Sequence, residues 1–461
     1  MRGDFSLLLP DLSDYSLVLL QQGRVLVESD WNAAMATLIS AQRELVADLI
    51  GPHGGPANNC GFAVTLAQDK KDVELSPGVY YVDGIRCELP LALLPAGAAT
   101  LPRSQQPYWV ALEPPPLPTD PYLVYLDVWE RHVSALEDDT IREVALGGPD
   151  TTSRRQIIWQ VRVMPYPPQG GTNPTCQNFP LDEWRKVLLG NPPLLRARTG
   201  PPPKDDDPCL ATPDARYRGV ENQLYRVEIA SVASSGGGED TTPTTLVWSR
   251  ENGSVAAAWT ATVGNRLHVA GVHDTRRGFT PNDWVELTWD TLEFAGIAGT
   301  RVQLTDVDGP VLTIDPDTAS DGIEPEPLKS PHAKIRRWDQ RGSKASPLVK
   351  GAVPVVESND DDSGWIPLED GIEIQFRAPN GGPHNYRVGD YWTIPARVAT
   401  GDIIWPRQAD GTPIAVPPHG IEHHYAPLAW VSGAAAPQSL QKMFNPLAAC
   451  VVTAQQRRGN R

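Results

Sequence analysis

The first fifty residues have a hydrophobic pattern of their own. In residues 15–27 apolar and polar stretches follow in turn, and we interpret them as an extended arm. Ser29 and Asp30 then give an N-cap signal, and Gly51-Pro52 gives a stop signal. The apolar residues between these signals share one helical face: Trp31, Met35, Leu38, Leu45 and Leu49, flanked by Ile39 and Val46. We therefore predict an extended arm and one amphipathic helix that runs to about Ile50.

From Phe62 onward the pattern changes to short apolar runs of strand length separated by turn residues. Asp83-Gly84 and Asp308-Gly309 each have the composition of a hairpin turn. The predicted strands cover residues 73–75, 79–82, 85–87, 108–112, 122–129, 157–163, 224–229, 245–249, 284–289, 301–305, 311–314, 371–376, 391–394 and 425–430. A short helix is predicted at 181–189. The pattern indicates a mainly β protein of several small sandwich or barrel-like domains, with one N-terminal amphipathic helix.

Breaks in this pattern suggest the domain organisation. Proline clusters weaken residues 165–220, which we interpret as an extended connector or long surface loop. The glycine-rich stretch 234–238 is predicted to be a loop tip, and the end of the chain is polar and basic. The resulting segments are 1–60 (arm and helix, an anchor), 61–165 (β domain), 166–220 (connector), 221–330 (β domain), 331–451 (β domain) and 452–461 (flexible tail).

Composition supports the β interpretation and narrows the partners. The 46 prolines and 39 glycines among 461 residues argue against long helices. A net charge of −16 disfavours nucleic acids and anionic lipids as partners. No apolar stretch is long enough to span a membrane, and no signal peptide is visible. We expect a protein made and assembled in the cytoplasm, which leaves the cell only by lysis or as part of a particle.

The five cysteines do not form a recognisable framework. None of them makes a CxxC pair, and their number is odd. Cys176 and Cys209 both lie in the predicted connector, so a disulfide between them is one alternative. Ordinary reduced thiols are the other alternative, and cytosolic chains favour it.

Signatures of common catalytic sites are missing from the sequence. It contains no Walker loop, no GxSxG elbow and no HExxH helix. His419, Glu422, His423 and His424 are the best metal candidates, but neighbouring histidines on a strand point to opposite faces. We therefore interpret them as structural and predict no catalytic residue, no metal and no cofactor.

Acidic clusters and aromatic residues offer weaker alternatives. The acidic runs at 359–362 and 205–207 lack the ligand spacing of a calcium loop, so we interpret them as solvated loops. The carboxylates between Glu130 and Glu143 could include a glycosidase pair, but carboxylates this common always offer such pairs, and we interpret them as an exposed acidic loop. Exposed tryptophans could stack on sugars, but several occur within strand patterns and are predicted to be core residues: Trp129, Trp159, Trp248 and Trp392.

Several motifs together resemble an uncharacterised family found with phage-tail-like contractile injection systems. They are residues 2–5, 21–25, 30–32, 125–131, 221–228, 248–253 and 389–397. The resemblance covers nearly the whole chain, apart from residues 165–220 and the basic tail. Residues 76–84 are similar to a turn-rich segment of tail fibre and baseplate proteins. The resemblance implies a structural particle component without catalysis.

The resemblance leaves the position in the particle open. A baseplate extension or cage, a fibre-like appendage and a cap-end adaptor are the alternatives, of which we favour the baseplate periphery. The partners would then be baseplate, sheath or spike proteins and further copies of this chain. A glycan-binding or glycan-cleaving β module is the alternative outside this class. The expected attachment residues lie in the arm and the helix: Phe5, Gln21, Gln22, Arg24, Trp31, Met35, Leu38 and Leu45.

Overall fold

The computed structural model describes most of the chain. The described residues are 2–5, 15–109, 116–118, 120–168, 171–200, 216–233, 243–271, 278–323, 331–342, 347–433 and 436–446. The predictions for Cys209, for the acidic run 205–207, for the loop 234–238 and for the tail 452–461 therefore lie outside them. With 37% of residues in strands and 14% in helices, the fold is mainly β, as predicted. No described helix has both the length and the apolar character needed to cross a bilayer.

The chain forms two compact units. Unit 1 contains residues 1–4, 132–155 and 189–421, and unit 2 contains residues 5–131, 156–188 and 422–461. The long strands β7 (Tyr122–Val133) and β8 (Arg154–Pro165) each cross the boundary between the two. The chain thus starts in unit 1, continues in unit 2 and returns to unit 1 twice.

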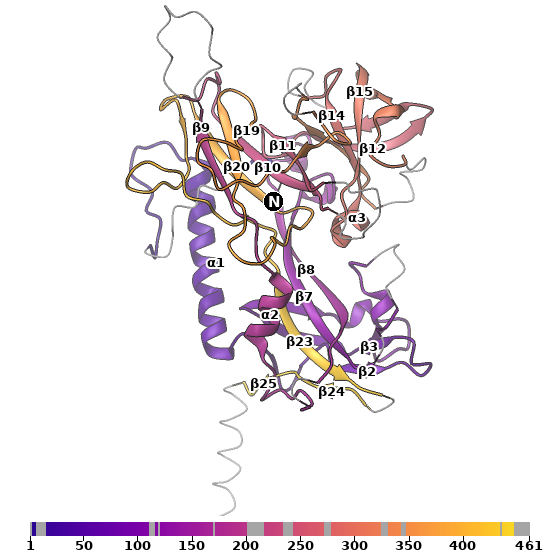
Figure 1. Ribbon diagram of the computed structural model, residues 1–461. Helices are drawn as coiled ribbons and strands as arrows, with labels where there is room; N and C mark the ends of the chain where they lie inside the picture. Colours follow the sequence, from indigo (N-terminus) through magenta and orange to yellow (C-terminus); the bar gives the residue numbers. More distant parts are fainter. Residues whose placement is uncertain are drawn as a thin grey trace, which may run out of the picture. The chain divides into compact units, whose positions relative to one another are not determined.

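Unit 2 contains the long helix and three sheets (Figure 1). Its helices are α1 (Glu28–Ile50) and α2 (Leu181–Leu189). The sheets have the strand orders β25-β1-β4-β5, β2-β3-β6 and β24-β23-β7-β8. The strands not yet given are β1 (His53–Pro56), β2 (Val64–Leu66), β3 (Val73–Leu75), β4 (Gly78–Val82), β5 (Ile85–Leu89), β6 (Leu101–Pro102), β23 (His424–Val431), β24 (Gln438–Ser439) and β25 (Met443–Phe444).

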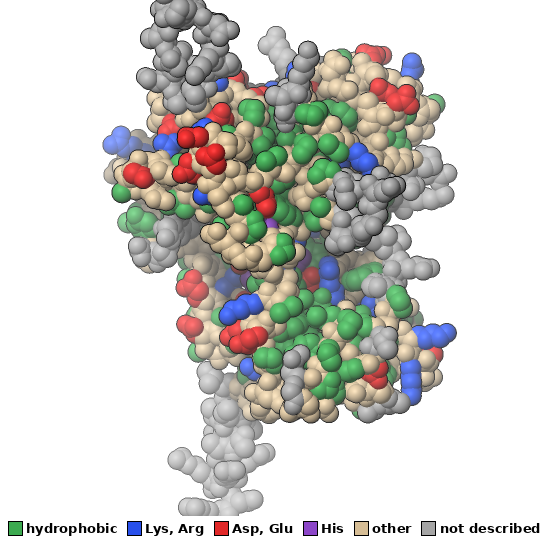
Figure 2. Space-filling view, in the orientation of Figure 1, with side chains coloured by type: hydrophobic (Ala, Val, Ile, Leu, Met, Phe, Trp, Pro, Cys, Tyr) green, Lys and Arg blue, Asp and Glu red, His purple; other side chains and the backbone are tan. Residues whose placement is uncertain are grey.

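Two apolar clusters hold unit 2 together. The larger joins side chains of all three sheets, including Tyr80, Leu126 and Trp159. The smaller one packs Trp184 of α2 against β7 and β23. On the face in Figure 2, hydrophobic side chains also gather over the part of unit 2 where β23 and β24 lie. Trp129 and Trp159 are buried here, which confirms their predicted place in the core.

Unit 1 combines a two-sheet sandwich with a closed barrel. The sandwich has the strand orders β18-β11-β10-β21-β22 and β19-β20-β9, and the barrel has the order β12-β13-β16-β15-β14-β17. The sandwich strands are β9 (Leu195–Thr199), β10 (Gln223–Ser231), β11 (Thr245–Ser249), β18 (Val353–Pro354), β19 (Ile366–Pro367), β20 (Ile372–Phe376), β21 (Tyr391–Arg397) and β22 (Asp402–Ile403). The barrel strands are β12 (Ala256–Val263), β13 (Arg266–Ala270), β14 (Trp284–Thr288), β15 (Thr300–Asp308), β16 (Val311–Asp315) and β17 (Lys334–Trp338). All six barrel strands lie between β11 and β18 in the sequence, so the barrel is an insertion into the sandwich.

Each half of unit 1 has its own core. Trp248 and Trp392 are buried in the sandwich core, as predicted, together with apolar residues of both sheets. The barrel encloses a second core around Leu267, Val302 and Ile335. The short helix α3 (Asp290–Ala295) follows β14 of the barrel. Side chains of β10, β11 and β17 form a small additional cluster between the barrel and the sandwich.

Several local predictions differ from the structure. Helix α1 starts at Glu28 with Val27 as N-cap, so the predicted cap at Ser29 and Asp30 is wrong, and no side chain caps the helix. Its end at Ile50 with Gly51 as C-cap is confirmed. Strand β9 lies within the predicted connector, and Tyr108 lies in a turn rather than in a strand. Strand β12 of the barrel was not predicted because its alanines and threonines give a weak pattern, and the five-residue β13 beside it was also missed.

Candidate functional site

The arm and helix α1 expose an unusual amount of apolar surface. Among the described residues, twenty-eight large hydrophobic side chains are exposed, and thirteen of them lie between Tyr15 and Leu49. Single exposed apolar side chains are normal, but a concentration of this kind marks an interaction site. We call residues 15–49 the leading surface.

Helix α1 turns its large apolar residues outward. The four helical residues predicted for attachment are exposed: Trp31 (59%), Met35 (43%), Leu38 (56%) and Leu45 (58%). The side chains that α1 buries are small ones, Ala33 and Thr37. An amphipathic helix normally buries its large apolar face. Helix α1 is rotated the other way, with its large apolar face toward the outside.

Contacts on the inner side attach α1 to unit 2. The guanidinium of Arg43 donates to the carboxylate of Glu130 at 2.7 Å. The backbone at Arg43 lies against Gly84 in the turn between β4 and β5, so closely that a Cβ at residue 84 would overlap it. Gly84 also has a positive φ of +78°, as the predicted hairpin turn requires. The turn therefore needs glycine both for its own conformation and for the approach of the helix.

The other predicted attachment residues lie in different surroundings. Gln21, Gln22 and Arg24 are exposed in a turn of the arm, where the Arg24 N–H donates to the Gln21 carbonyl at 3.3 Å. Phe5 is half-buried and is separated from the arm by residues outside the described ranges. The structure thus brings together the four residues of α1, while the remaining four lie along the chain that precedes the helix.

Residues 2–4 are attached to unit 1 by a buried polar site that was not predicted. Arg2 Nε donates to Glu228 Oε2 at 3.0 Å, and Arg2 Nη1 donates to Glu293 Oε1 at 3.1 Å. Its Nη2 makes a further bond to Glu228, so the pair is bidentate. The Gly3 N–H donates to the Asn252 carbonyl at 3.1 Å, and the Asn252 side chain donates back to the Gly3 carbonyl at 3.0 Å. We call these contacts the N-terminal anchor.

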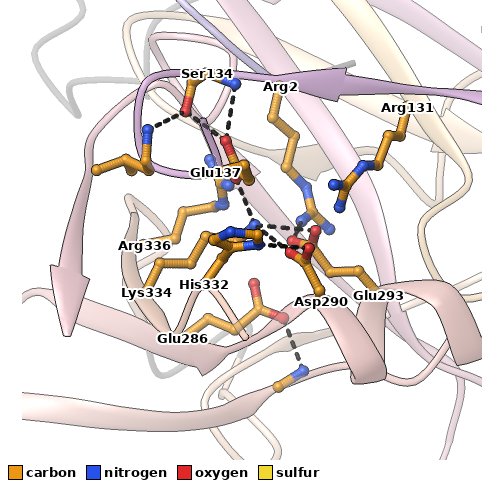
Figure 3. A network of polar contacts seen from close by, with 12 residues as sticks. Arg2, Arg131, Ser134, Glu137, Glu286, Asp290, Glu293, His332, Lys334 and Arg336 are labelled. Atoms are coloured by element: carbon orange, nitrogen blue, oxygen red, sulfur yellow. Dashed lines mark hydrogen bonds and ion pairs between the residues drawn. The ribbon is translucent and has the colours of Figure 1, made fainter. Parts of the chain in front are cut away.

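A cluster of charged side chains extends the N-terminal anchor, and Figure 3 shows its residues converging from separate elements. Lys334 of β17 is 1% exposed, and its Nζ donates to Glu137 at 2.6 Å and to Glu293 at 3.0 Å. Glu137 also accepts bonds from the N–H and the hydroxyl of Ser134. Glu293 thus joins Lys334 to Arg2 and links the cluster to the start of the chain.

The electrostatics keep these groups charged. Burial alone would raise the pKa of Glu228, but Arg2 and Arg226 outweigh it and hold this pKa at about 2. Burial likewise opposes ionisation of Glu137, and Lys334 nevertheless holds its pKa well below the usual range. Burial would lower the pKa of Arg2, and Glu228 instead raises it above its ordinary value. The buried charges therefore stabilise one another, as paired buried ions must.

The candidate metal histidines have other partners. His419 Nδ1 lies 3.1 Å from the backbone nitrogen and the hydroxyl of Thr393. His423 Nδ1 lies 2.6 Å from Asp127, and His424 Nδ1 lies 3.0 Å from Asp83. Within the described part of the chain, no group of three or more His, Cys, Asp or Glu residues is arranged to hold a metal ion.

The carboxylates considered for catalysis also make structural contacts. Glu130 pairs with Arg43, and Glu137 pairs with Lys334. Asp138 caps a turn by accepting from the Thr140 N–H at 3.0 Å. In the acidic run 359–362, Asp361 accepts from Arg196 at 2.7 Å. Each of these four carboxylates therefore has a hydrogen-bond partner within the chain.

The N-terminal anchor connects motifs that looked separate in the sequence. Arg2, Glu228 and Asn252 each belong to one of the segments that carry the family resemblance, and the fold brings all three together. Isolated acidic residues and an Asn-Gly turn give no sign of pairing with the start of the chain. The one signal in the sequence was that all three residues lie in motifs that carry the family resemblance.

Comparison with known proteins gives one match. A family model described as a family of unknown function matches residues 1–173 and 189–461. No curated protein and no solved structure matches the chain.

Proposed function

Because this chain belongs to the DUF6519 family, whose function is unknown, we propose its role from its own surfaces and from the resemblance in its sequence. The role is that of a structural component of a phage-tail-like contractile injection particle. The chain attaches at the baseplate periphery, as an extension, cage or fibre-like part, through the leading surface.

One observation carries this proposal. In the described part of the chain, thirteen of the twenty-eight exposed large apolar side chains fall within residues 15–49, and those of α1 point away from the unit that holds the helix. Leaving this area in water is unfavourable by about 25 cal/mol per Å². In a subunit of a permanent assembly, such a surface is covered by a neighbouring subunit.

The rest of the molecule suits a scaffold. The sandwich and barrel of unit 1 have filled cores, and the tryptophans predicted as core residues are buried rather than displayed for sugar binding. The N-terminal anchor fixes the start of the chain to unit 1 by bidentate and charge-assisted bonds. Rigid bodies of this kind offer surface for assembly without needing a pocket.

The experiment replaces the outward face of α1 without deleting the chain that carries Arg2. A variant with Trp31, Met35, Leu38 and Leu45 all changed to glutamine is produced in a host that makes the particles. We expect the variant to fold and to disappear from particles purified by sedimentation, while sheath and tube proteins are still recovered.

A matched control removes the same amount of exposed apolar surface elsewhere. Leu91, Leu146, Val263 and Met443 are each more than 60% exposed, and their change to glutamine leaves the leading surface intact. We expect this control to enter particles at the wild-type level. Equal incorporation of both variants would contradict the proposal, and binding of the purified chain to a polysaccharide array would favour the glycan-binding alternative.

A further inference from the structure

The exposed face of α1 has the spacing of a coiled-coil seam. Positions 28, 31, 35, 38, 42, 45 and 49 follow one another at alternating intervals of three and four residues. Such a 3–4 alternation places side chains along one line facing a partner helix. All seven side chains are exposed, and five of them are large and apolar: Trp31, Met35, Leu38, Leu45 and Leu49. We call these seven positions the α1 seam.

The seam is directed away from unit 2 along the whole helix. Ala33 and Thr37, which are buried, lie on the opposite side of the helix from the seam. Arg43 and Ile50 also face inward, where they contact Glu130 and Gly54. A helix of twenty-three residues is about 34 Å long, so the seam offers about three heptads to a partner. The geometry therefore fits another helix better than a loop or a strand.

The charges of α1 argue against a second copy of this chain as the occupant. In a parallel self-pair, Glu28 would face Glu28 of the other copy, because both occupy the same seam position. In an antiparallel self-pair centred on Leu38, Glu28 would come close to Asp48 of the other copy. Either arrangement brings carboxylates together between chains that each carry a net charge of −16.

The same charges describe the partner. Arg43 is the only basic residue in α1, and its guanidinium is engaged with Glu130 on the inner side. Glu28 occupies the first position of the seam, and Asp48 is exposed beside its C-terminal end. The last turn has no basic residue, so nothing on the helix offsets the negative end of its dipole. A partner with lysine or arginine beside its apolar stripe would neutralise these groups.

We propose that the α1 seam binds an amphipathic helix of a different protein, one whose apolar heptad stripe is bordered by lysine or arginine. This inference rests on the proposed function and names the chemistry of the neighbour at the same surface. The apolar residues supply affinity, and the acidic groups at the two ends of the seam select a basic partner.

The test uses the full chain and two synthetic helices of about four heptads. Both peptides have leucine and isoleucine at the seam positions. One has lysine at all flanking positions, and the other has glutamate there. Fluorescence anisotropy of labelled peptide measures binding at low salt, and sedimentation measures the oligomeric state of the chain alone. We expect the lysine peptide to bind roughly tenfold tighter than the glutamate peptide, and the chain alone to be a monomer.

Two pairs of variants assign the binding to the seam. Leu38→Gln with Leu45→Gln should weaken lysine-peptide binding by roughly tenfold, whereas Leu91→Gln with Leu146→Gln should not. Glu28→Lys with Asp48→Lys should reverse the preference toward the glutamate peptide. Asp306→Lys with Asp308→Lys changes the same net charge on exposed residues of β15 and should leave the preference unchanged. Circular dichroism checks that each variant is folded.

Each contrary outcome is informative. Equal binding of the two peptides, or no binding of the lysine peptide, overturns the inference about charge. Concentration-dependent oligomers that Leu38→Gln with Leu45→Gln abolishes would show that a second copy occupies the seam. If the lysine peptide does not bind selectively but the fourfold glutamine variant of α1 is lost from particles, the proposed function still stands. If the lysine peptide binds selectively but that variant enters particles normally, only the proposed function is overturned.

Discussion

Two neighbouring parts of the N-terminal region use opposite kinds of surface. At residues 2–4 the chain places a charged side chain in a nearly closed site, where Arg2 bonds to Glu228 and Glu293. At residues 15–49 it leaves leucines, valines and a tryptophan in contact with water. The usual distribution of charge outside and apolar groups inside is inverted in both.

The difference shows which contacts are completed within the chain. The charges of the N-terminal anchor have partners in the same unit, so burying them is tolerated. The apolar groups of the leading surface have no comparable cover among the described residues, and we propose that another molecule covers them. Four predictions test this comparison, in order of expected effect.

Removing the charge of Arg2 should have the largest effect. In Arg2→Met, Glu228 and Glu293 both lose a buried partner, and breaking such a pair costs about 4 kcal/mol of the free energy of unfolding. Denaturant titration measures the change. Arg24→Met, which alters an exposed arginine of the arm, should change stability by less than about 0.5 kcal/mol. A similar small effect at Arg2 would mean that the N-terminal anchor is incidental.

Acid should weaken the N-terminal anchor with a defined pH dependence. The pKa of Glu228 is about 2 in the folded chain, below its ordinary value of 4.5, so its contribution is complete above about pH 4.5. It is lost as the pH falls from 4.5 toward 2, by about 3 kcal/mol in total. Denaturant titrations across this range measure the loss. In Arg2→Met the free energy of unfolding should depend less steeply on pH. An unchanged slope would mean that Arg2 does not hold the pKa of Glu228 down.

Changing Gly84 should loosen the attachment of α1. Gly84→Ala introduces a Cβ that overlaps the backbone at Arg43 and adds strain at a φ of +78°, for a combined cost of about 2 kcal/mol. Gly97→Ala is the matched control, because Gly97 has the same φ and no atom within 4 Å of the added Cβ. Hydrogen exchange should speed up along α1 in the first variant only. Equal exchange in both would show that the contact with the turn does not hold the helix.

Changing the outward leucines of α1 should have the smallest effect on stability. Leu38→Gln with Leu45→Gln should shift the free energy of unfolding by less than about 0.5 kcal/mol, because both side chains are more than half exposed. Ala33→Leu, on the buried side of the same helix, should cost about 2 kcal/mol by overpacking. Thermal unfolding distinguishes the two. A large loss from the outward change would mean that these leucines stabilise the chain itself.

Local chemistry explains what was predictable at the strand level. Asp83-Gly84 forms a hairpin turn because aspartate and glycine tolerate the positive φ that the turn needs. At the second predicted turn Gly309 has the positive φ, while Asp308 ends β15 and pairs with Val311. The strands β10 and β11 were predictable from a different local signal, namely short apolar runs of strand length. The weakly patterned barrel strand β12, the five-residue β13 beside it, and β9 in a proline-rich stretch depended on tertiary pairing and were missed.

The sequence by itself determined a mainly β fold, the end of α1 at Ile50 and the existence of one apolar face on that helix. Only the tertiary structure decided that this face points outward and that Arg2 lies against Glu228 and Asn252. The physical reason is range, because turn and helix signals act over a few residues. The inward side of α1 depends instead on Glu130, 87 positions from Arg43, and the buried pair of Arg2 and Glu228 joins residues 226 positions apart.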